Sequence, residues 1–298
     1  GLKMMRLVKQ TAWILLCLLV TGVAQAQLNA KQLMQKVNNN QRQSTDSAFN
    51  VMQLTTCKYG TKDGKLKCIE KPRIKLLESA QINTGTNNKH SQSIAIILEP
   101  SSKRGIGMLT YTYDESGKDN ETWLYLSALG KVKRIASGGS DEETEPTSLF
   151  ASEITTEDQE TGKLDDYTYE ILQRGQYKGR PVAVIESTPT SKRLQHTRYG
   201  KTRTWVDTER FIALKMQMFD KYGSPIKQVT MSKIEQINDL WLARSVTFKN
   251  LVSQRLTNMN IKAISFGLDI DSQFLTQRAL TDQVFRQTHL QKLRQQAK

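Results

Sequence analysis

ETWLYLSALGKVKRI, residues 121–135, contains four consecutive large apolar side chains: Trp123, Leu124, Tyr125 and Leu126. A strand with one face in water alternates apolar and polar residues, so this run predicts a strand that is covered on both faces. In a mostly antiparallel sheet, the second cover is either a helix or a bound ligand. Three cations then follow within four residues, and they indicate that the chain leaves the interior for a basic rim: Lys131, Lys133 and Arg134.

The remaining sequence is typical of an antiparallel β-protein with a helix at each end. Short extended segments alternate with polar turns, and no regular alternation of strands and helices occurs. A helix is expected over 28–37, with Leu33, Met34 and Val37 on one face, and another over 275–298. Strands are expected from residue 48 onward and over 74–82, 93–98, 107–113, 166–173, 182–187, 203–207, 213–219, 227–233, 241–248 and 256–266.

Two segments interrupt the strands after residue 135. Residues 137–147, SGGSDEETEPT, are expected to form a solvated acidic loop, because their spacing matches no calcium-binding loop. Residues 148–158, SLFASEITTED, place Leu149, Phe150 and Ile154 among small and acidic residues. That pattern is compatible with a short helix or lid over an apolar opening, and equally with ordinary core packing.

Residues 1–26 have the pattern of a secretory signal peptide. Three cations precede an apolar run at 12–20, and Ala24-Gln25-Ala26 is a small-residue cleavage site. The run is shorter than the roughly 20 residues that a membrane-spanning helix needs. We therefore expect cleavage after Ala26, export to the periplasm of a Gram-negative cell, and a single domain over 27–298.

The chain is basic, with a net charge of +14 that cleavage would lower to +11. Export argues against a nucleic-acid partner, so the positive charge indicates instead an anionic lipid surface or an acidic partner protein. A merely solvated basic surface is an equal alternative.

Two cysteines remain once Cys17 leaves with the signal peptide. Cys57 and Cys68 flank Asp63-Gly64, a dipeptide that favours the tight turn of a β-hairpin. In an oxidising compartment a disulfide is expected between them. Their spacing is unlike that of zinc ligands, so no metal site is expected.

The sequence contains no recognisable catalytic motif. The three histidines, His90, His196 and His289, lie in unrelated polar settings, and no nucleophile is spaced with a base as in known hydrolases. We expect neither an enzyme nor a cofactor.

Several segments together resemble the bacterial outer membrane lipoprotein-sorting protein family, relatives of the periplasmic carrier LolA. The resemblance is carried, in order, by 123–135, 148–158, 180–189, 205–207, 214–223, 239–241 and 274–280. It departs from the family pattern at Ser127, where proline is usual, and within 148–158, where the family usually has S-F-M-G-S-(D/E)-F-T-Y-E-D.

The resemblance implies an unclosed antiparallel β-barrel with helices plugging an apolar concave face. It also implies a periplasmic carrier of lipids or lipoprotein acyl chains that works with an RND- or MMPL-type inner-membrane exporter. The alternative is a regulatory or partner-binding protein of the same fold that transfers no cargo. We expect the cations named above at the rim of the cavity and these residues in it: Trp123, Tyr125, Phe150, Trp205, Met216, Met218 and Phe248.

Overall fold

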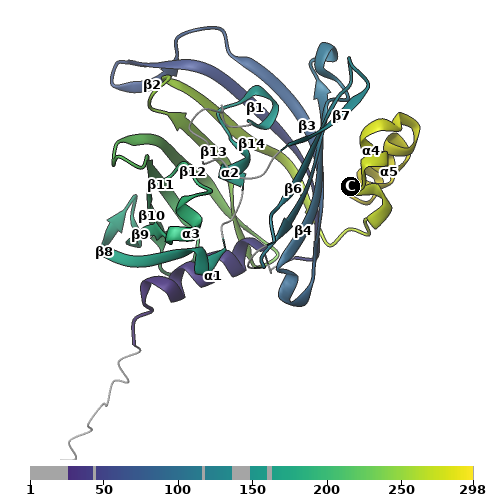
Figure 1. Cartoon of the computed structure of the whole chain (residues 1–298). Helices are drawn as coiled ribbons and strands as arrows, with labels where there is room; N and C mark the ends of the chain where they lie inside the picture. The colour runs from purple at the N-terminus through teal and green to yellow at the C-terminus, as the bar shows by residue number, and fades with distance from the viewer. Residues whose placement is uncertain (1–25, 43–44, 116–117, 136–147, 160–162, 298) are drawn as a thin grey trace, which may run out of the picture.

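The fold is one strongly curved antiparallel sheet with helices on both of its faces (Figure 1). The computed structural model describes residues 26–42, 45–115, 118–135, 148–159 and 163–297, so the expected signal peptide up to Gln25 and the acidic loop lie outside the described residues. The strands are β1 (Ser47–Lys62), β2 (Lys65–Cys68), β3 (Arg73–Thr84), β4 (His90–Glu99), β5 (Gly107–Tyr113), β6 (Glu121–Leu126), β7 (Lys131–Ile135), β8 (Tyr167–Tyr177), β9 (Arg180–Pro189), β10 (Lys201–Asp207), β11 (Ala213–Phe219), β12 (Pro225–Ile237), β13 (Leu240–Asn250) and β14 (Arg255–Phe266).

Within the described residues the sheet has 14 strands, in the order β7-β6-β5-β4-β3-β1-β14-β13-β12-β11-β10-β9-β8, with β2 paired to β1 beside this path. Nearly all neighbours are consecutive in sequence, and the pairing of β1 with β14 joins the two halves of the chain. The sheet ends at β7 on one side and β8 on the other, so the barrel is not closed. The expected unclosed antiparallel barrel is therefore confirmed.

The first helix, α1 (Ala30–Arg42), lies inside the curve of the sheet (Figure 1). Asn29 and Gln32 begin it by reciprocal bonds, in which each backbone N–H donates to the other side chain at 2.9 Å. The expected apolar face packs as predicted, because Leu33 and Val37 are buried against Ile185 and neighbouring residues of β9 and β10.

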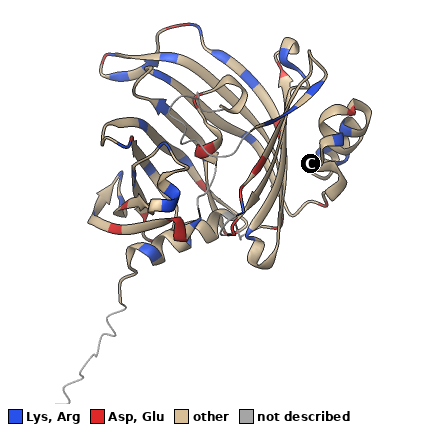
Figure 2. Ribbon diagram, viewed as in Figure 1, with Lys and Arg blue, Asp and Glu red and all other residues tan. Residues whose placement is uncertain are grey.

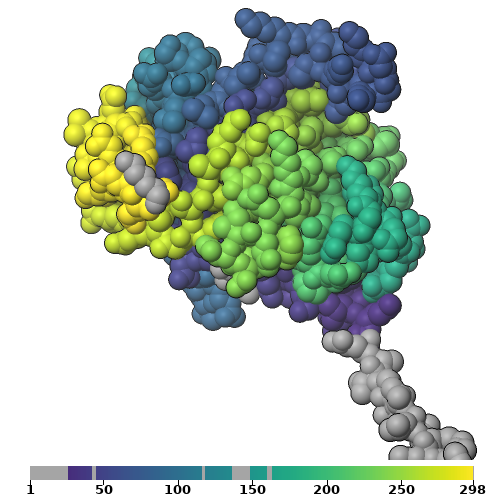
Figure 3. Space-filling view, turned by 180° about the vertical axis from the view of Figure 1, so that it is seen from behind, coloured from purple at the N-terminus to yellow at the C-terminus, as the bar shows by residue number. Residues whose placement is uncertain are grey.

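The C-terminal helices lie on the opposite, outer face of the sheet. After a short helical turn (Ser272–Phe274), α4 (Gln277–Thr281) and α5 (Gln283–Gln296) pack over β3–β7, where Figure 3 shows them in yellow against the early strands. Asp282 caps α5 by accepting the Phe285 N–H at 3.0 Å. The helices thus divide between the two faces, because α1, the short α2 (Thr156–Gln159) and the short α3 (Ser191–Leu194) lie on the concave side.

The β1–β2 hairpin is closed by the expected disulfide. Cys57 and Cys68 are bonded, with their Cα atoms 5.6 Å apart. Asp63 and Gly64 adopt the positive φ values of 53° and 74° that the turn requires. Figure 2 shows the cations of this part of the sheet, and four of them are exposed on the hairpin: Lys58, Lys62, Lys65 and Lys67.

Candidate functional site

An apolar cavity of about 250 Å³ lies on the concave face, between α1, α2 and strands β8–β13. Its apolar wall comes from alternate residues of β11, β12 and β13, because successive side chains of a strand point to opposite faces. This wall consists of Met216, Met218, Val229, Met231, Val246 and Phe248. Glu157 and Asp158 of α2 also line the cavity, so its surface joins an apolar wall to a polar side.

Four of the seven residues that the sequence suggested for lipid binding meet here. Met216, Met218 and Phe248 line the cavity. Phe150 packs in the same apolar cluster as Met218 and Phe248, from the segment that covers it. The structure therefore brings together residues that are up to about 100 positions apart in sequence.

Trp123 and Tyr125 lie on the other face of the sheet. They pack against the cluster beneath α4 and α5, and the ring of Trp123 contacts that of Tyr111 edge-on at 5.1 Å. Leu124, between them, packs on the concave side. The strand is covered on both faces, as its sequence predicted, but the cover over the two aromatic residues is the C-terminal helix pair.

Trp205 also lies away from the cavity. It packs with Val182 and Leu214 in a separate cluster, and the Lys215 ammonium lies 4.7 Å from its ring centre. Its neighbours Thr204 and Val206 point to the concave side instead. A bulge explains why Leu214 does not continue the stripe of Met216 and Met218, since the pairing of β10 with β11 shifts by one residue there.

The three expected rim cations lie on β7, which is an edge strand of the sheet. Lys133 pairs with Leu124 and therefore shares its concave face, whereas Arg134 shares the outer face with Trp123. The guanidinium of Arg134 lies 5.7 Å from the Trp123 ring centre and 3.4 Å from the Glu121 carboxylate. The cations thus divide between the two faces of one edge.

Residues 148–159 form a segment that covers the concave cluster, and we call this segment the lid. Its apolar side chains, Leu149, Phe150 and Ile154, are buried in the same cluster as Met218 and Phe248. Phe150 and Ala151 have positive φ values of 49° and 58°, which cost on the order of 1–3 kcal/mol each for residues other than glycine. Lys75 stabilises this turn, because its ammonium donates to the Phe150 carbonyl at 2.7 Å.

The polar side of the lid is clamped to the barrel by a buried ion pair. The Asp158 carboxylate is fully buried and accepts from the Lys227 ammonium at 2.5 Å and from the Tyr199 hydroxyl. Glu157 accepts from the Thr197 hydroxyl and lies 3.6 Å from the Arg193 guanidinium. Thr155 and Asp158 also bond reciprocally, which begins α2.

Burial raises the pKa of two groups beside the Asp158–Lys227 pair. The pKa of the Glu157 carboxyl rises because of burial, and the hydrogen bond from Thr197 and the charge of Arg193 only partly oppose this rise. Burial and the nearby Asp158 charge also raise the pKa of the Tyr199 hydroxyl, which therefore remains a neutral donor at pH 7.

Sequence reasoning missed the residues of the clamp. One signal was available, because Lys227 alternates with Val229 and Met231 and so belongs to the buried stripe of β12. A lone lysine in such a stripe needs a buried acid as its partner. That Asp158 supplies this acid follows only from the tertiary structure.

Within the described ranges, no group of three or more histidine, cysteine, aspartate or glutamate side chains is arranged to hold a metal ion. None of the helices in the same ranges is both long and apolar enough to cross a membrane.

Residues 89–282, which include the lid and most of the cavity wall, match the model of an "Uncharacterized protein"-like family. The chain belongs to this family. Among curated proteins, no sequence matches the chain significantly.

Three solved structures share the LolA-like fold of this family member. A domain from Vibrio parahaemolyticus, described as an outer membrane lipoprotein-sorting protein, is 20% identical over 85% of this chain and 98% of its own, with a TM-score of 0.72. A DUF1329 family protein from Desulfovibrio piger is 18% identical over 85% and 99%, with a TM-score of 0.71. A LolA superfamily protein from Nitrosomonas europaea is 16% identical over 84% and 98%, with a TM-score of 0.57.

Proposed function

We propose that this protein is a periplasmic carrier that binds an acyl chain of a lipid or lipoprotein in the cavity beneath the lid. The observation that carries the proposal is the apolar, methionine-rich cavity bordered by a segment that has an apolar underside and a polar clamp. Methionine side chains adapt to irregular apolar partners. Burial of each CH₂ group contributes about 0.8 kcal/mol, so affinity requires no catalytic group.

The cavity is slightly smaller than the roughly 300–1,000 Å³ of typical small-molecule sites. The closed form therefore accommodates a short length of chain, and withdrawal of Phe150 and Ile154 with the lid would extend the space into the rest of the concave cluster. We propose that cargo enters by displacement of the lid, with rupture of the Asp158–Lys227 pair as the main polar cost.

The signal-peptide pattern and the name of the Vibrio domain support a periplasmic role in lipoprotein sorting. An RND- or MMPL-type exporter as the membrane partner rests on the family resemblance alone. A single domain over 27–298 is part of the same proposal.

Displacement of cis-parinaric acid, a fatty acid that fluoresces in apolar surroundings, tests the function. The full chain should bind the probe saturably. Met216→Glu should abolish binding, because a charge in the apolar wall costs several kcal/mol. Gln217→Glu, the matched control, places the same charge on the opposite face of β11 and should bind normally.

Met231→Trp provides a second test without a charge, since the larger side chain fills part of the cavity and should weaken binding. Circular dichroism confirms that each variant is folded. A wild-type protein that binds no acyl probe, or folded Met216→Glu and Met231→Trp variants with wild-type affinity, would refute the carrier proposal and favour the partner-binding alternative.

A further inference from the structure

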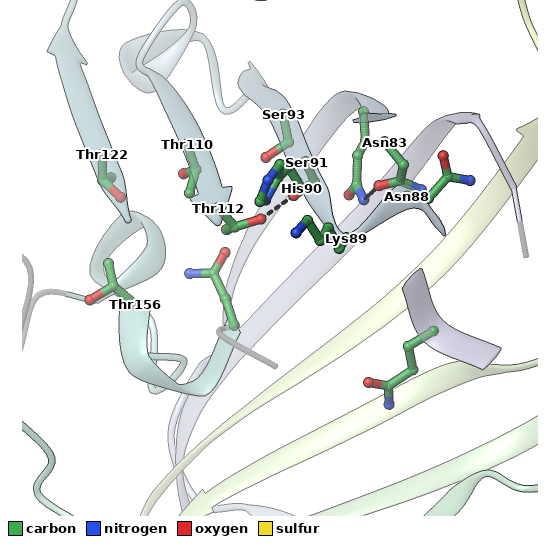
Figure 4. A pocket seen from close by; sticks show the side chains of 13 residues that line it. Asn83, Asn88, Lys89, His90, Ser91, Ser93, Thr110, Thr112, Thr122 and Thr156 are labelled. Atoms are coloured by element: carbon green, nitrogen blue, oxygen red, sulfur yellow. Dashed lines mark hydrogen bonds between the residues drawn. The ribbon is translucent and has the colours of Figure 1, made fainter. Parts of the chain in front are cut away.

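A second cavity, of about 380 Å³, lies on the concave face of β3–β6 and is lined almost entirely by polar residues. Figure 4 shows hydroxyl and amide side chains from neighbouring strands turned toward this space. The strand register explains the arrangement, because directly paired residues share a face. One row crosses four strands as Gln81, Ser93, Thr110 and Thr122, and the next row contains Asn83, Ser91 and Thr112.

Two residues away on β4, β5 and β6, the side chains on the concave face are apolar. Ala95, Met108 and Leu124 form the adjoining row on the concave face, and they belong to the apolar cluster beneath the lid. The concave surface of β4–β6 therefore changes from apolar to hydroxylated within one side-chain spacing. A chamber with such a boundary fits an amphiphile better than a pure hydrocarbon.

Several of the hydroxyls are free to bind a ligand. Ser91 and Thr112 bond to each other, and Asn83 is oriented by bonds to Gln81 and to the Thr45 carbonyl. In contrast, the hydroxyls of Thr110 and Thr122 make no hydrogen bond within the described part of the chain. Both hydroxyls line the cavity and are therefore available to a ligand.

The composition of this cavity favours a ligand group that is rich in hydroxyls, because hydroxyl and amide side chains make up most of its lining. Among its described lining residues, only Lys89 and His90 are ionisable, and no carboxylate is present. Hydroxyl and amide groups both donate and accept hydrogen bonds, as sugar hydroxyls do. A phosphate-bearing headgroup would instead be matched by a cluster of arginines.

The polar and apolar cavities are neighbours. Gln41 of α1 lines both, and α2 presents Thr156 and Gln159 to the polar cavity and Glu157 and Asp158 to the apolar one. We infer that the cargo is an amphiphile with an uncharged, hydroxyl-rich headgroup of the carbohydrate type, which occupies the polar cavity while the acyl chain occupies the apolar one. This inference rests on the proposed carrier function and names its ligand class.

The test compares three ligands that share one alkyl chain, each used below its micellar concentration to displace cis-parinaric acid: dodecyl maltoside, dodecylphosphocholine and dodecanoate. The wild-type chain should bind the maltoside about tenfold more tightly than the phosphocholine, the gain expected from two additional hydrogen bonds. Thr110→Val/Thr122→Val, which removes two hydroxyls at nearly constant volume, should erase this tenfold preference and leave phosphocholine binding unchanged.

Thr230→Val is the matched control, because Thr230 neighbours the cavity residue Val229 on β12 and points to the opposite face. It should retain the preference for maltoside. Equal affinity of wild-type protein for the three ligands, or a preference that survives the double substitution, would overturn the inference while the carrier function stands. Failure of every dodecyl ligand to displace the probe would refute the carrier function itself. Binding of free maltose as tightly as dodecyl maltoside would assign the cavity to a soluble glycan and overturn the amphiphile.

Discussion

Two apolar clusters lie on opposite faces of the sheet, and they differ in composition and packing. The outer cluster, beneath α4 and α5, is built from leucine, isoleucine and aromatic residues, and Phe274, Leu275 and Leu280 have no exposed surface. The inner cluster contains six of the nine methionines of the chain and borders a cavity. Branched and aromatic side chains specify one close packing, whereas methionine adapts to variable partners. We therefore expect the outer cluster to stabilise the barrel and the inner cluster to tolerate changes in the groups that pack against it.

Substitution of one phenylalanine in each cluster should separate these roles most strongly. Phe274→Ala should lower the free energy of unfolding by about 3–5 kcal/mol, because Phe274 is fully enclosed and stacks on His289. Phe248→Ala should cost clearly less, since Phe248 already borders empty space, and it should weaken binding of an acyl probe. Urea denaturation and probe titration measure the two effects. Equal losses of stability with unchanged binding would show that the inner cluster is an ordinary core.

The ion pair of the lid gives the next effect. Lys227→Met leaves the buried Asp158 carboxylate without its cation, at a cost of about 3 kcal/mol if the lid stays closed. Because the lid can instead open, we expect faster hydrogen exchange over 149–158 and a smaller change in global stability. Lys233→Met, an exposed position on the same strand, is the control. Unchanged exchange in the lid of the Lys227 variant would contradict a clamp that governs opening.

The smallest expected effect comes from a comparison of two carboxylates, Asp207 at the end of β10 and Glu157 in the lid. Asp207 is fully buried, and although burial alone would raise its pKa, hydrogen bonds from Arg180 and Arg210 lower it to about 2. Its ionised form is therefore favoured in the folded state and stabilises the protein by about 2 kcal/mol above pH 4. This contribution is lost as the pH falls from about 4 to 2.

Asp207→Asn should accordingly be about 2 kcal/mol less stable than wild type at pH 7, and the difference should shrink toward pH 2. The pKa of Glu157 shifts in the opposite direction, because burial raises it above the ordinary value. The folded state therefore favours the protonated carboxyl, and stability decreases as the pH rises through the raised pKa. Glu157→Gln should therefore lose no stability at neutral pH. Unfolding free energies of both variants across pH 2–7 check the two signs, and a pH-independent deficit for Asp207→Asn would contradict the assigned pKa.

Much of the fold follows from local patterns in the sequence. β5 and β11 begin and end where alternation and turns predicted, and α1 buries Leu33 and Val37 as its periodicity required. Asp63-Gly64 determined the hairpin and hence the pairing of Cys57 with Cys68. These features depend on residues that are close together in the chain, so the sequence alone is sufficient to predict them.

The sequence by itself determined that Trp123, Leu124 and Tyr125 form a strand with two apolar faces, and that Met216 and Met218 share one face. Only the tertiary structure decided what covers each face, because that depends on the path of the C-terminal chain back to β3–β6. The bulge between β10 and β11 reversed the face of Leu214, and Trp205 proved to lie outside the cavity. The ion pair of Asp158 with Lys227 arises from the packing of α2 against the distant strand β12, and the polar rows of β3–β6 arise from the register of the strands. The hydrophobic period of the sequence specifies neither.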